Sequence, residues 1–179
     1  HRWRLAYAFS SASDTDNGYH PQNLFRLVSR SKWKNPRVQM SFRIVKDNLS
    51  SSQNRNESNG ILIMSRYVDG DDLYYAGVRV DGTAVIKKKE KGIYHTLAQT
   101  PVFPGNYNRD SSPDLLPHSE WITLMSETET HPDGAVDIRL YVSRRDDEPR
   151  MVLTYIDPPN AKPITATPKP IGIRTDFMD

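Results

Sequence analysis

Alternating apolar and polar residues mark most of this chain as β-strand. In the segment 37–46, Val38, Met40, Phe42 and Ile44 alternate with mostly polar residues. A period of two places these apolar side chains on one face of a strand, whereas a helix would repeat them every three or four residues. No long stretch of the chain has helical periodicity.

The same pattern predicts a series of short strands separated by polar segments rich in Gly and Pro. The predicted strands cover residues 2–10, 23–30, 37–46, 61–67, 73–80, 83–89, 92–99, 120–127, 135–142, 150–156 and 171–177. Short strands with turn residues between them predict an all-β fold, either an antiparallel sandwich or a barrel. A chain of 179 residues suits one domain with a sizeable core, so residues 1–179 are predicted to form a single domain.

Asp81-Gly82 indicates a tight hairpin between the strands 73–80 and 83–89, because both residues tolerate the positive φ of a two-residue turn. In that register Tyr75 faces Lys88. One face of the hairpin is then predicted to enter the core, and it carries Tyr74, Ala76, Val78, Val80 and Val85. The other face carries Tyr75, Gly77, Arg79, Ala84 and Lys88.

This second face has the residue types of a sugar site. An aromatic ring such as Tyr75 stacks on a sugar ring, and cations such as Arg79 and Lys88 bind hydroxyls or carboxylates. We therefore predict these three residues as ligand contacts, the alternative being an ordinary solvated face. Arg43 and Arg139 lie on the polar sides of their strands and would join Arg79 in a basic groove if those sides share one concave face. The alternative is that they are scattered surface arginines.

Composition narrows the classes of partner. The 24 basic and 22 acidic residues give a net charge of only +2, and no apolar run is long enough to cross a bilayer. The basic run 87–91 lies close to several acidic residues and is interpreted as a charged strand end that discourages edge pairing. We therefore predict neither a nucleic-acid partner nor membrane insertion. The absence of Cys excludes disulfides, thiolate metal sites and a Cys nucleophile.

Few motifs point to catalysis or to a metal. The carboxylates of Asp69-Gly70-Asp71-Asp72 are a candidate calcium site, but their spacing is not that of an EF-hand, so an acidic turn is the default. No other cofactor is predicted. His95 beside Tyr94 would offer the base and the acid that a polysaccharide lyase needs, and His118 is a further candidate. No phosphate loop, nucleophile elbow or zinc motif is present, and no catalytic residue is assigned.

The stretch SRYVDGDDLYYAGVRVDGTAVIKKKEKGIYHTLA at 65–98 resembles the concanavalin A-like jelly rolls, including laminin-G-like domains, that accompany or act on polysaccharides. The segment IGIRTDFMD at 171–179 resembles the penultimate strand of these domains. The resemblance implies a jelly-roll β-sandwich and a polysaccharide or oligosaccharide ligand. Alginate-lyase-like members carry a Gln-x-His strand and a Tyr-x-Lys-x-Gly strand. The first is missing and the second is matched only in part at 74–77, so no catalytic residues are implied.

The expected function is therefore that of an extracellular or cell-surface domain, or a periplasmic one, that binds a neutral or anionic polysaccharide on a concave sheet face. Two alternatives stay open. The first is a polysaccharide lyase or glycoside hydrolase on the same fold. The second is a structural or adhesive module that contacts another protein.

Overall fold

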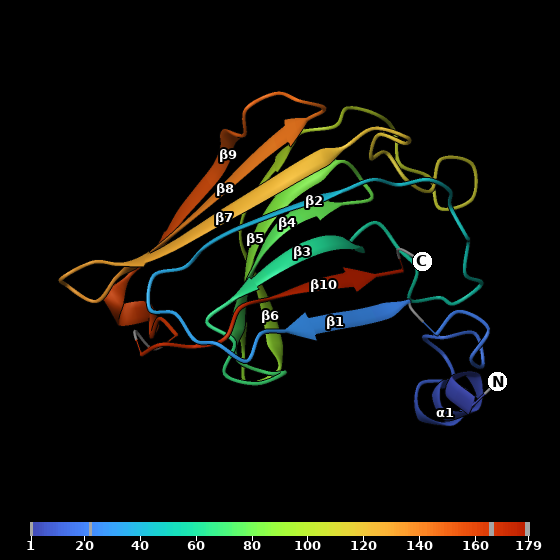
Figure 1. The fold of residues 1–179 in the computed structure, drawn as a ribbon, viewed down its shortest axis with the longest axis horizontal. Coiled ribbons are helices and arrows are strands. Elements are labelled where there is room, and N and C mark those ends of the chain that lie inside the picture. The colour runs from blue at the N-terminus through green and yellow to red at the C-terminus, as the bar shows by residue number, and fades with distance from the viewer. Residues whose placement is uncertain (1, 22, 165–166, 178–179) are drawn as a thin grey trace.

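Two antiparallel β-sheets packed face to face form the body of the molecule (Figure 1). The computed structural model describes residues 2–21, 23–164 and 167–177. The larger sheet has the strand order β1-β10-β3-β4-β5-β6, and the smaller has the order β2-β7-β8-β9. The strands are β1 (Leu24–Val28), β2 (Arg37–Phe42), β3 (Gly60–Ser65), β4 (Leu73–Arg79), β5 (Thr83–Glu90), β6 (Ile93–Pro101), β7 (Ile122–Thr130), β8 (Val136–Arg144), β9 (Arg150–Asp157) and β10 (Gly172–Asp176). The predicted antiparallel β-sandwich is confirmed.

The apolar core lies between the sheets and follows the period of two. On β4 it contains Tyr74, Ala76 and Val78, and on β8 it contains Ile138 and Leu140, all almost completely buried. β4 lies against both β7 and β8. Burial of a large apolar side chain is worth about 1.5–3 kcal/mol, so this layer fixes which face of each strand looks inward. The side chains between these positions on β4 and β8 must point outward.

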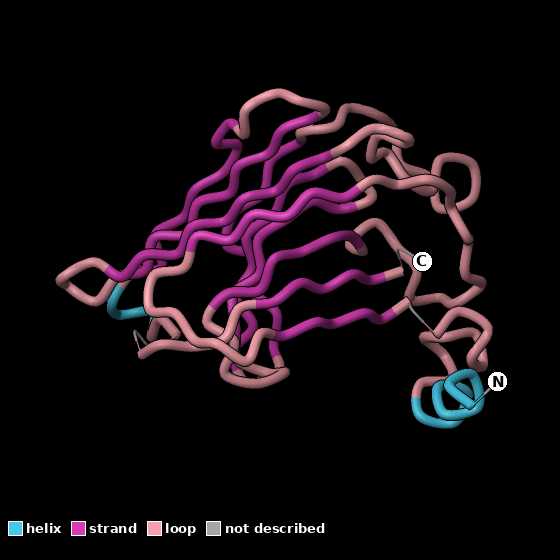
Figure 2. Tube along the Cα trace, viewed as in Figure 1, coloured by secondary structure: helices cyan, strands magenta, loops and turns pink. Residues whose placement is uncertain are grey.

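The first segment differs from the sequence-based expectation. Residues 2–10, predicted as a strand, form the helix α1 (Arg2–Ser10), which buries no side chain and lies beside the sheets (Figures 1 and 2). Its Ala, Leu and Arg residues favour a helix, and no neighbouring strand is there to pair with it. In the described residues the only other helix is the single 3₁₀ turn η1 (Pro159–Ala161).

The β4–β5 hairpin is also shifted from its predicted register. Its turn has three residues, Val80, Asp81 and Gly82, so Tyr75 pairs with Lys87 and not with Lys88. Val80 leaves the ladder because its N–H donates to the carbonyl of Asn59 at 2.9 Å. A shift of one residue moves every β5 side chain to the other face. Ala84 and Lys88 therefore point into the sandwich and Val85 points outward, the reverse of the prediction.

Across the residues that the structure describes, we find no helix with the length and apolar character needed to cross a membrane.

Candidate functional site

The outward face of the six-stranded sheet is concave. Arg174 on β10 donates hydrogen bonds to the hydroxyls of Tyr75 on β4, at 3.0 Å, and of Tyr94 on β6, at 2.8 Å. β10 and β6 are four strand positions apart, which on a flat sheet would be about 19 Å. The two side chains could not meet across that distance, so the sheet must curl around them.

A hollow of about 500 Å³ lies on this concave face, and we call it the sheet hollow. Tyr75, Tyr94, Lys87, Arg174 and Asp176 contribute to it from β4, β6, β5 and β10. The loop between β2 and β3 closes one side with polar residues. The loop residues that line the hollow are Asn54, Asn56, Ser58 and Asn59.

Arg174 is the centre of the polar network in the hollow. Its Nε donates to Asp176 Oδ1 at 2.6 Å, and both side chains are largely buried. Burial would lower the pKa of the guanidinium, but Asp176 and the two tyrosines outweigh it and hold the pKa above its ordinary value. The guanidinium is thus a permanent, oriented cation in the hollow.

The two tyrosines differ in exposure and in acidity. Tyr75 is 1% exposed, whereas Tyr94 is 48% exposed and stacks on it with 6.0 Å between ring centroids. Burial raises the pKa of Tyr75 to about 12, although Arg174 opposes this. Burial would also raise the pKa of Tyr94, but Arg174 and Lys89 reverse the shift, so this pKa lies below its ordinary value. Tyr94 therefore presents the ring surface that a ligand can reach.

Lys87 is the cation of the hollow that is left for a ligand. Among the described residues, its ammonium group has no hydrogen-bond or ion-pair partner. Burial, and secondarily the positive charge of Arg79, lowers its pKa. An ammonium group held partly out of water and without a hydrogen-bond partner is favourably placed to donate hydrogen bonds to a bound molecule.

The structure brings only some of the predicted contact residues together. Tyr75 and Arg79 share the concave face, as predicted, and Tyr75 lines the hollow. Arg79 does not line it, because its guanidinium is engaged by Asp81 at 2.8 Å and by the carbonyl of Glu57 at 3.2 Å. The exposed aromatic surface belongs to Tyr94 and not to Tyr75.

Lys88 lies on the opposite face from Tyr75 and Arg79, so the predicted placement is wrong. It is 3% exposed, and its Nζ donates to the carbonyls of Ala161 and Lys162 at 2.8 Å each. The same atom lies 3.0 Å from a carboxylate oxygen of Asp157, which is also buried. Lys88 therefore stabilises the interior and cannot contact a ligand in the hollow.

The predicted basic groove of Arg43, Arg79 and Arg139 does not form. Arg139 is on the outward face of β8 in the other sheet, where it pairs with Asp137, Glu127 and Glu129. Arg43 follows the end of β2, and its guanidinium lies 5.6 Å from the ring centroid of Trp121. Arg43 and Arg139 belong to the four-stranded sheet or its connections, whereas Arg79 lies on the outward face of the six-stranded sheet.

The other candidates from the sequence are not brought together as active sites. Tyr94 and His95 are adjacent on β6, so their side chains point to opposite faces. In the acidic turn, Asp69 accepts the N–H groups of Asp71 and Asp72, and Asp71 pairs with Lys89. These carboxylates are engaged by the turn backbone and by Lys89, and among the described residues no close group of three potential metal ligands includes them.

Sequence reasoning missed Lys87, Tyr94, Arg174 and Asp176 as members of the hollow. The predicted register placed Lys88 on the face of Tyr75, whereas the observed register places Lys87 there. Alternation near the end of the chain does give a signal for two of the others. It places Arg174 and Asp176 on the same face of one strand. Their meeting with Tyr94 depends on the strand order and on the curl, which the sequence pattern does not contain.

Comparison of the sequence with protein-family models and with curated proteins gives no significant match. The fold resembles that of a carbohydrate-binding module. The solved structure is the carbohydrate binding module CBM66 from Bacillus subtilis, which aligns with a TM-score of 0.55 and 15% sequence identity. The alignment covers 86% of this chain and 74% of that chain. At this identity the likeness shows a shared fold, and function has to be argued from the site.

Proposed function

We propose that this chain binds a polysaccharide or oligosaccharide in the sheet hollow. The observation that carries the proposal is Lys87, an ammonium group without a described partner, set beside the exposed ring of Tyr94 and the Arg174–Asp176 pair. A ring to stack on, donors on one side and a carboxylate acceptor on the other are what a sugar with several hydroxyls requires.

Lys87 favours a ligand with at least one anionic group. Lys87 and Arg174 bring two positive charges to the hollow and Asp14 and Asp176 two negative ones, and Asp176 pairs with Arg174 through its 2.6 Å bond. The ammonium group of Lys87 forms no hydrogen bond among the described residues, and a carboxylate or sulfate on the sugar would accept one from it. A neutral sugar would still be held by the same groups, with fewer charge-assisted bonds.

The fold likeness supports a carbohydrate ligand without identifying the sugar. Together with the residues 65–98, it also supports assigning the chain to the concanavalin A-like jelly rolls, of which laminin-G-like domains are part. Polysaccharides that carry carboxylates or sulfates are found outside cells, and we therefore propose an extracellular or cell-surface location.

Binding to a panel of neutral, uronate-containing and sulfated polysaccharides tests the proposal. Lys87→Met and Tyr94→Ala are compared with the unchanged chain by affinity electrophoresis and then by calorimetry on the ligand that binds. A hydrogen bond to a charged group is worth about 1.5–3 kcal/mol, so Lys87→Met should weaken binding roughly tenfold to 100-fold.

Arg139→Met is the matched control, because it removes a cation from the outward face of the other sheet. It should leave the affinity unchanged. Binding that is weakened by Arg139→Met and not by Lys87→Met would move the site to the smaller sheet. If no member of the panel binds, the carbohydrate function is rejected.

One observation favours a polysaccharide lyase as a second candidate. Arg174 and Lys89 hold the pKa of Tyr94 below its ordinary value, although burial raises it, and Lys87 in the same hollow could pair with a uronate carboxylate. A tyrosine of this kind can accept a proton at lower pH than a free phenol. New ultraviolet absorbance from unsaturated uronates, abolished by Tyr94→Phe, would favour the lyase over binding alone.

A further inference from the structure

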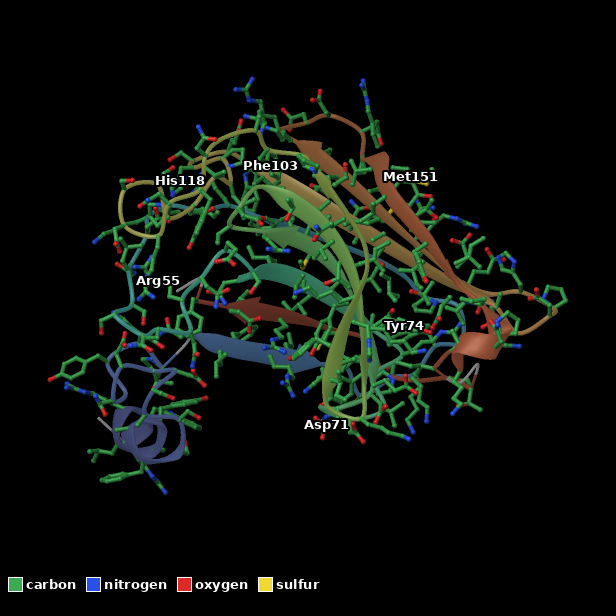
Figure 3. All side chains as sticks on the ribbon, turned by 180° about the vertical axis from the view of Figure 1, so that it is seen from behind. Arg55, Asp71, Tyr74, Phe103, His118 and Met151 are labelled. Atoms are coloured by element: carbon green, nitrogen blue, oxygen red, sulfur yellow. The ribbon has the colours of Figure 1, made fainter. Side chains whose placement is uncertain are left out.

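A second group of polar side chains lies on the loops at the opposite end of the molecule from the acidic turn that contains Asp71 (Figure 3). It consists of Asp47, just beyond β2, and of Asp114 and His118 in the long connection between β6 and β7. One ligand atom from each of the three side chains lies within 4.8 Å of the others. We call these residues the Asp-Asp-His cluster.

The loop that carries two members of this cluster is fixed by the core. Leu116, between them, is 1% exposed and belongs to the core between the sheets. Its N–H donates to Asp114 Oδ1 at 2.8 Å, and its carbonyl lies 3.1 Å from His118 Nδ1. One buried residue therefore orients both an Asp and a His through its own backbone.

The position of His118 is anchored from β2 as well. His118 forms an isolated bridge with Ile44, and the N–H of Ser119 donates to the Ile44 carbonyl at 2.7 Å. Ile44 is itself a core residue. The segment that ends in Asp47 and the segment that contains His118 are thus held side by side, which sets the distance between their side chains.

The hydrogen bond to the Leu116 carbonyl decides which nitrogen of His118 carries the proton. A carbonyl only accepts, so Nδ1 must be the donor, and the other ring nitrogen, Nε2, then has a lone pair in the neutral ring or carries a second proton in the charged ring. Nε2 lies 3.0 Å from Asp47 Oδ1, which is also an acceptor. Two acceptors at this distance need a cation between or beside them, either a second proton on the ring or a metal ion.

This arrangement is the one that metal-binding histidines usually have. A ligating His donates its other N–H to a carbonyl or carboxylate, which fixes the ring and the tautomer. Two carboxylates and one imidazole nitrogen suit Zn²⁺ and related transition metals, whereas Ca²⁺ prefers oxygen ligands alone. We propose that Asp47, Asp114 and His118 form a binding site for a divalent transition metal ion, with Zn²⁺ as the preferred ion.

The surroundings leave room for a further ligand. Asp47 and Asp114 both line a cavity of about 460 Å³, which is separate from the sheet hollow except for the shared residues Asn59 and Phe177. Arg43, Lys46 and Arg55 also line this cavity, and Arg55 is engaged by the carbonyls of Ser50 and Arg109. An ion with three protein ligands keeps an open position, and these cations favour an anionic oxygen there.

A bound cation would also stabilise the charged forms of Asp47 and Asp114. A divalent ion would offset the repulsion between the two carboxylates. The site goes beyond the proposed sugar binding, because none of its three ligands lines the sheet hollow.

Calorimetric titration of the untagged full chain with ZnCl₂, MnCl₂ and CaCl₂, after chelator treatment and dialysis, tests the site. We expect one Zn²⁺ per chain, weaker binding of Mn²⁺ and no measurable binding of Ca²⁺. Zn²⁺ should also raise the thermal unfolding midpoint, since it binds the folded chain. Asp47→Asn and His118→Lys remove ligands and should weaken Zn²⁺ binding by more than the roughly 10–100-fold that outer-shell partners contribute.

His118→Lys keeps a positive charge beside Asp47, so its midpoint without metal should stay close to that of the unchanged chain. His131→Lys is the matched control, because His131 also lies beside an aspartate, Asp137, at 3.9 Å, and is outside the cluster. It should bind Zn²⁺ as tightly as the unchanged chain. Equal Zn²⁺ binding by the His118→Lys variant overturns the proposal. The proposal is also overturned if the unchanged chain binds none of the three ions. In that case His118 is a protonated ion-pair partner of Asp47. Either result leaves the sugar site untouched.

Discussion

Lys87 and Lys88 are neighbours in the sequence but have opposite roles. Lys88 is buried with the Asp157 carboxylate 3.0 Å away, and Tyr74 donates to the same carboxylate oxygen at 2.5 Å. Replacing Lys88 with Met would leave Asp157, which is 2% exposed, as a buried charge without its cation. Breaking such a pair on one side costs about 3–5 kcal/mol, so Lys88→Met should lower the free energy of unfolding by that amount in urea denaturation.

Lys87→Met is the control for this prediction, since it makes the same change one residue earlier. It removes an ammonium group that burial already disfavours, so the free energy of unfolding should stay within about 0.5 kcal/mol or rise. The two variants should therefore separate stability from sugar binding. A stability loss of the same size in both would contradict the assignment of Lys88 to the interior and Lys87 to the hollow.

At the level of single residues, the sequence predicted the side-chain faces of β4 correctly and those of β5 wrongly. Tyr75 and Arg79 were placed on the same outward face correctly, because the core residues Tyr74, Ala76 and Val78 fix the faces of β4. A basic residue on a strand gives no sign of whether it is solvated or paired in the interior. The partners of the buried Lys88 ammonium group are Asp157 and the carbonyls of Ala161, in η1, and of Lys162, directly after it, all far away in the chain.

At the level of elements, alternation located nearly every strand but not the register between strands. The β4–β5 turn has the Asp-Gly signal of a two-residue turn, yet Gly82 with φ of +80° closes a three-residue turn. The decisive interaction is the bond from the Val80 N–H to Asn59, a residue of another connection. Residues 2–10 were misassigned for a related reason, because a strand needs a partner and this segment has none.

Gly77 lies at a close contact between the backbones of β4 and β3. A Cβ at this position would lie 2.1 Å from the carbonyl oxygen of Ile61 on β3, and the atoms it meets are backbone. Gly77→Ala must therefore push β3 and β4 apart. We expect a loss of about 1–3 kcal/mol in the free energy of unfolding, measured by chemical denaturation.

Gly70→Ala provides the comparison for Gly77→Ala. There the nearest atom is the end of the flexible Arg26 side chain at 3.3 Å, so the change should cost less than about 0.5 kcal/mol. Because a displaced β4 would also move Tyr75, which lines the hollow, Gly77→Ala should weaken sugar binding and Gly70→Ala should not. Unchanged stability in Gly77→Ala would show that the β3–β4 contact is looser than the structure has it.

At the level of the whole molecule, the candidate site is a product of the fold. β10, β4 and β6 supply Arg174, Tyr75 and Tyr94, which are distant in the sequence and not adjacent in the sheet. Alternation alone could predict that each points away from the core. The strand order and curvature that bring them together depend on long-range pairing, which short-range patterns do not encode.

The N-terminal segment, residues 2–21, lies beside the sandwich. It contacts the loop between β2 and β3 that closes one side of the sheet hollow. Asp16 accepts hydrogen bonds from Ser50 at 2.5 Å, Ser51 at 3.2 Å and His20 at 2.6 Å. Ser50 and Ser51 precede Asn54, which lines the hollow. The loop between β2 and β3 is therefore held in place by a segment that contributes no buried side chain from α1.

Asp16→Asn should loosen this loop without unfolding the sandwich. Asn tolerates the positive φ of 47° at this position and so removes the charge without straining the backbone. Burial raises the pKa of Asp16, but the bonds from Ser50, His20 and Ser51 outweigh it, so the pKa lies below its ordinary value of 3.8. The contact is thus present above pH 3.8 and is lost as the pH falls through the lowered pKa.

Hydrogen exchange followed by mass spectrometry measures the effect on this loop directly. At neutral pH, Asp16→Asn should speed exchange at residues 50–55, while the amides of β4 and β5 keep their protection. In the unchanged chain, acidification should have the same local effect once intrinsic rates are corrected for pH. Asp146→Asn, at an exposed carboxylate between β8 and β9, should change neither region.

Faster exchange throughout the sheets would show that the N-terminal segment stabilises the whole sandwich. Unchanged exchange at 50–55 would show that the loop is held by its own contacts, such as those of Arg55 with Ser50 and Arg109.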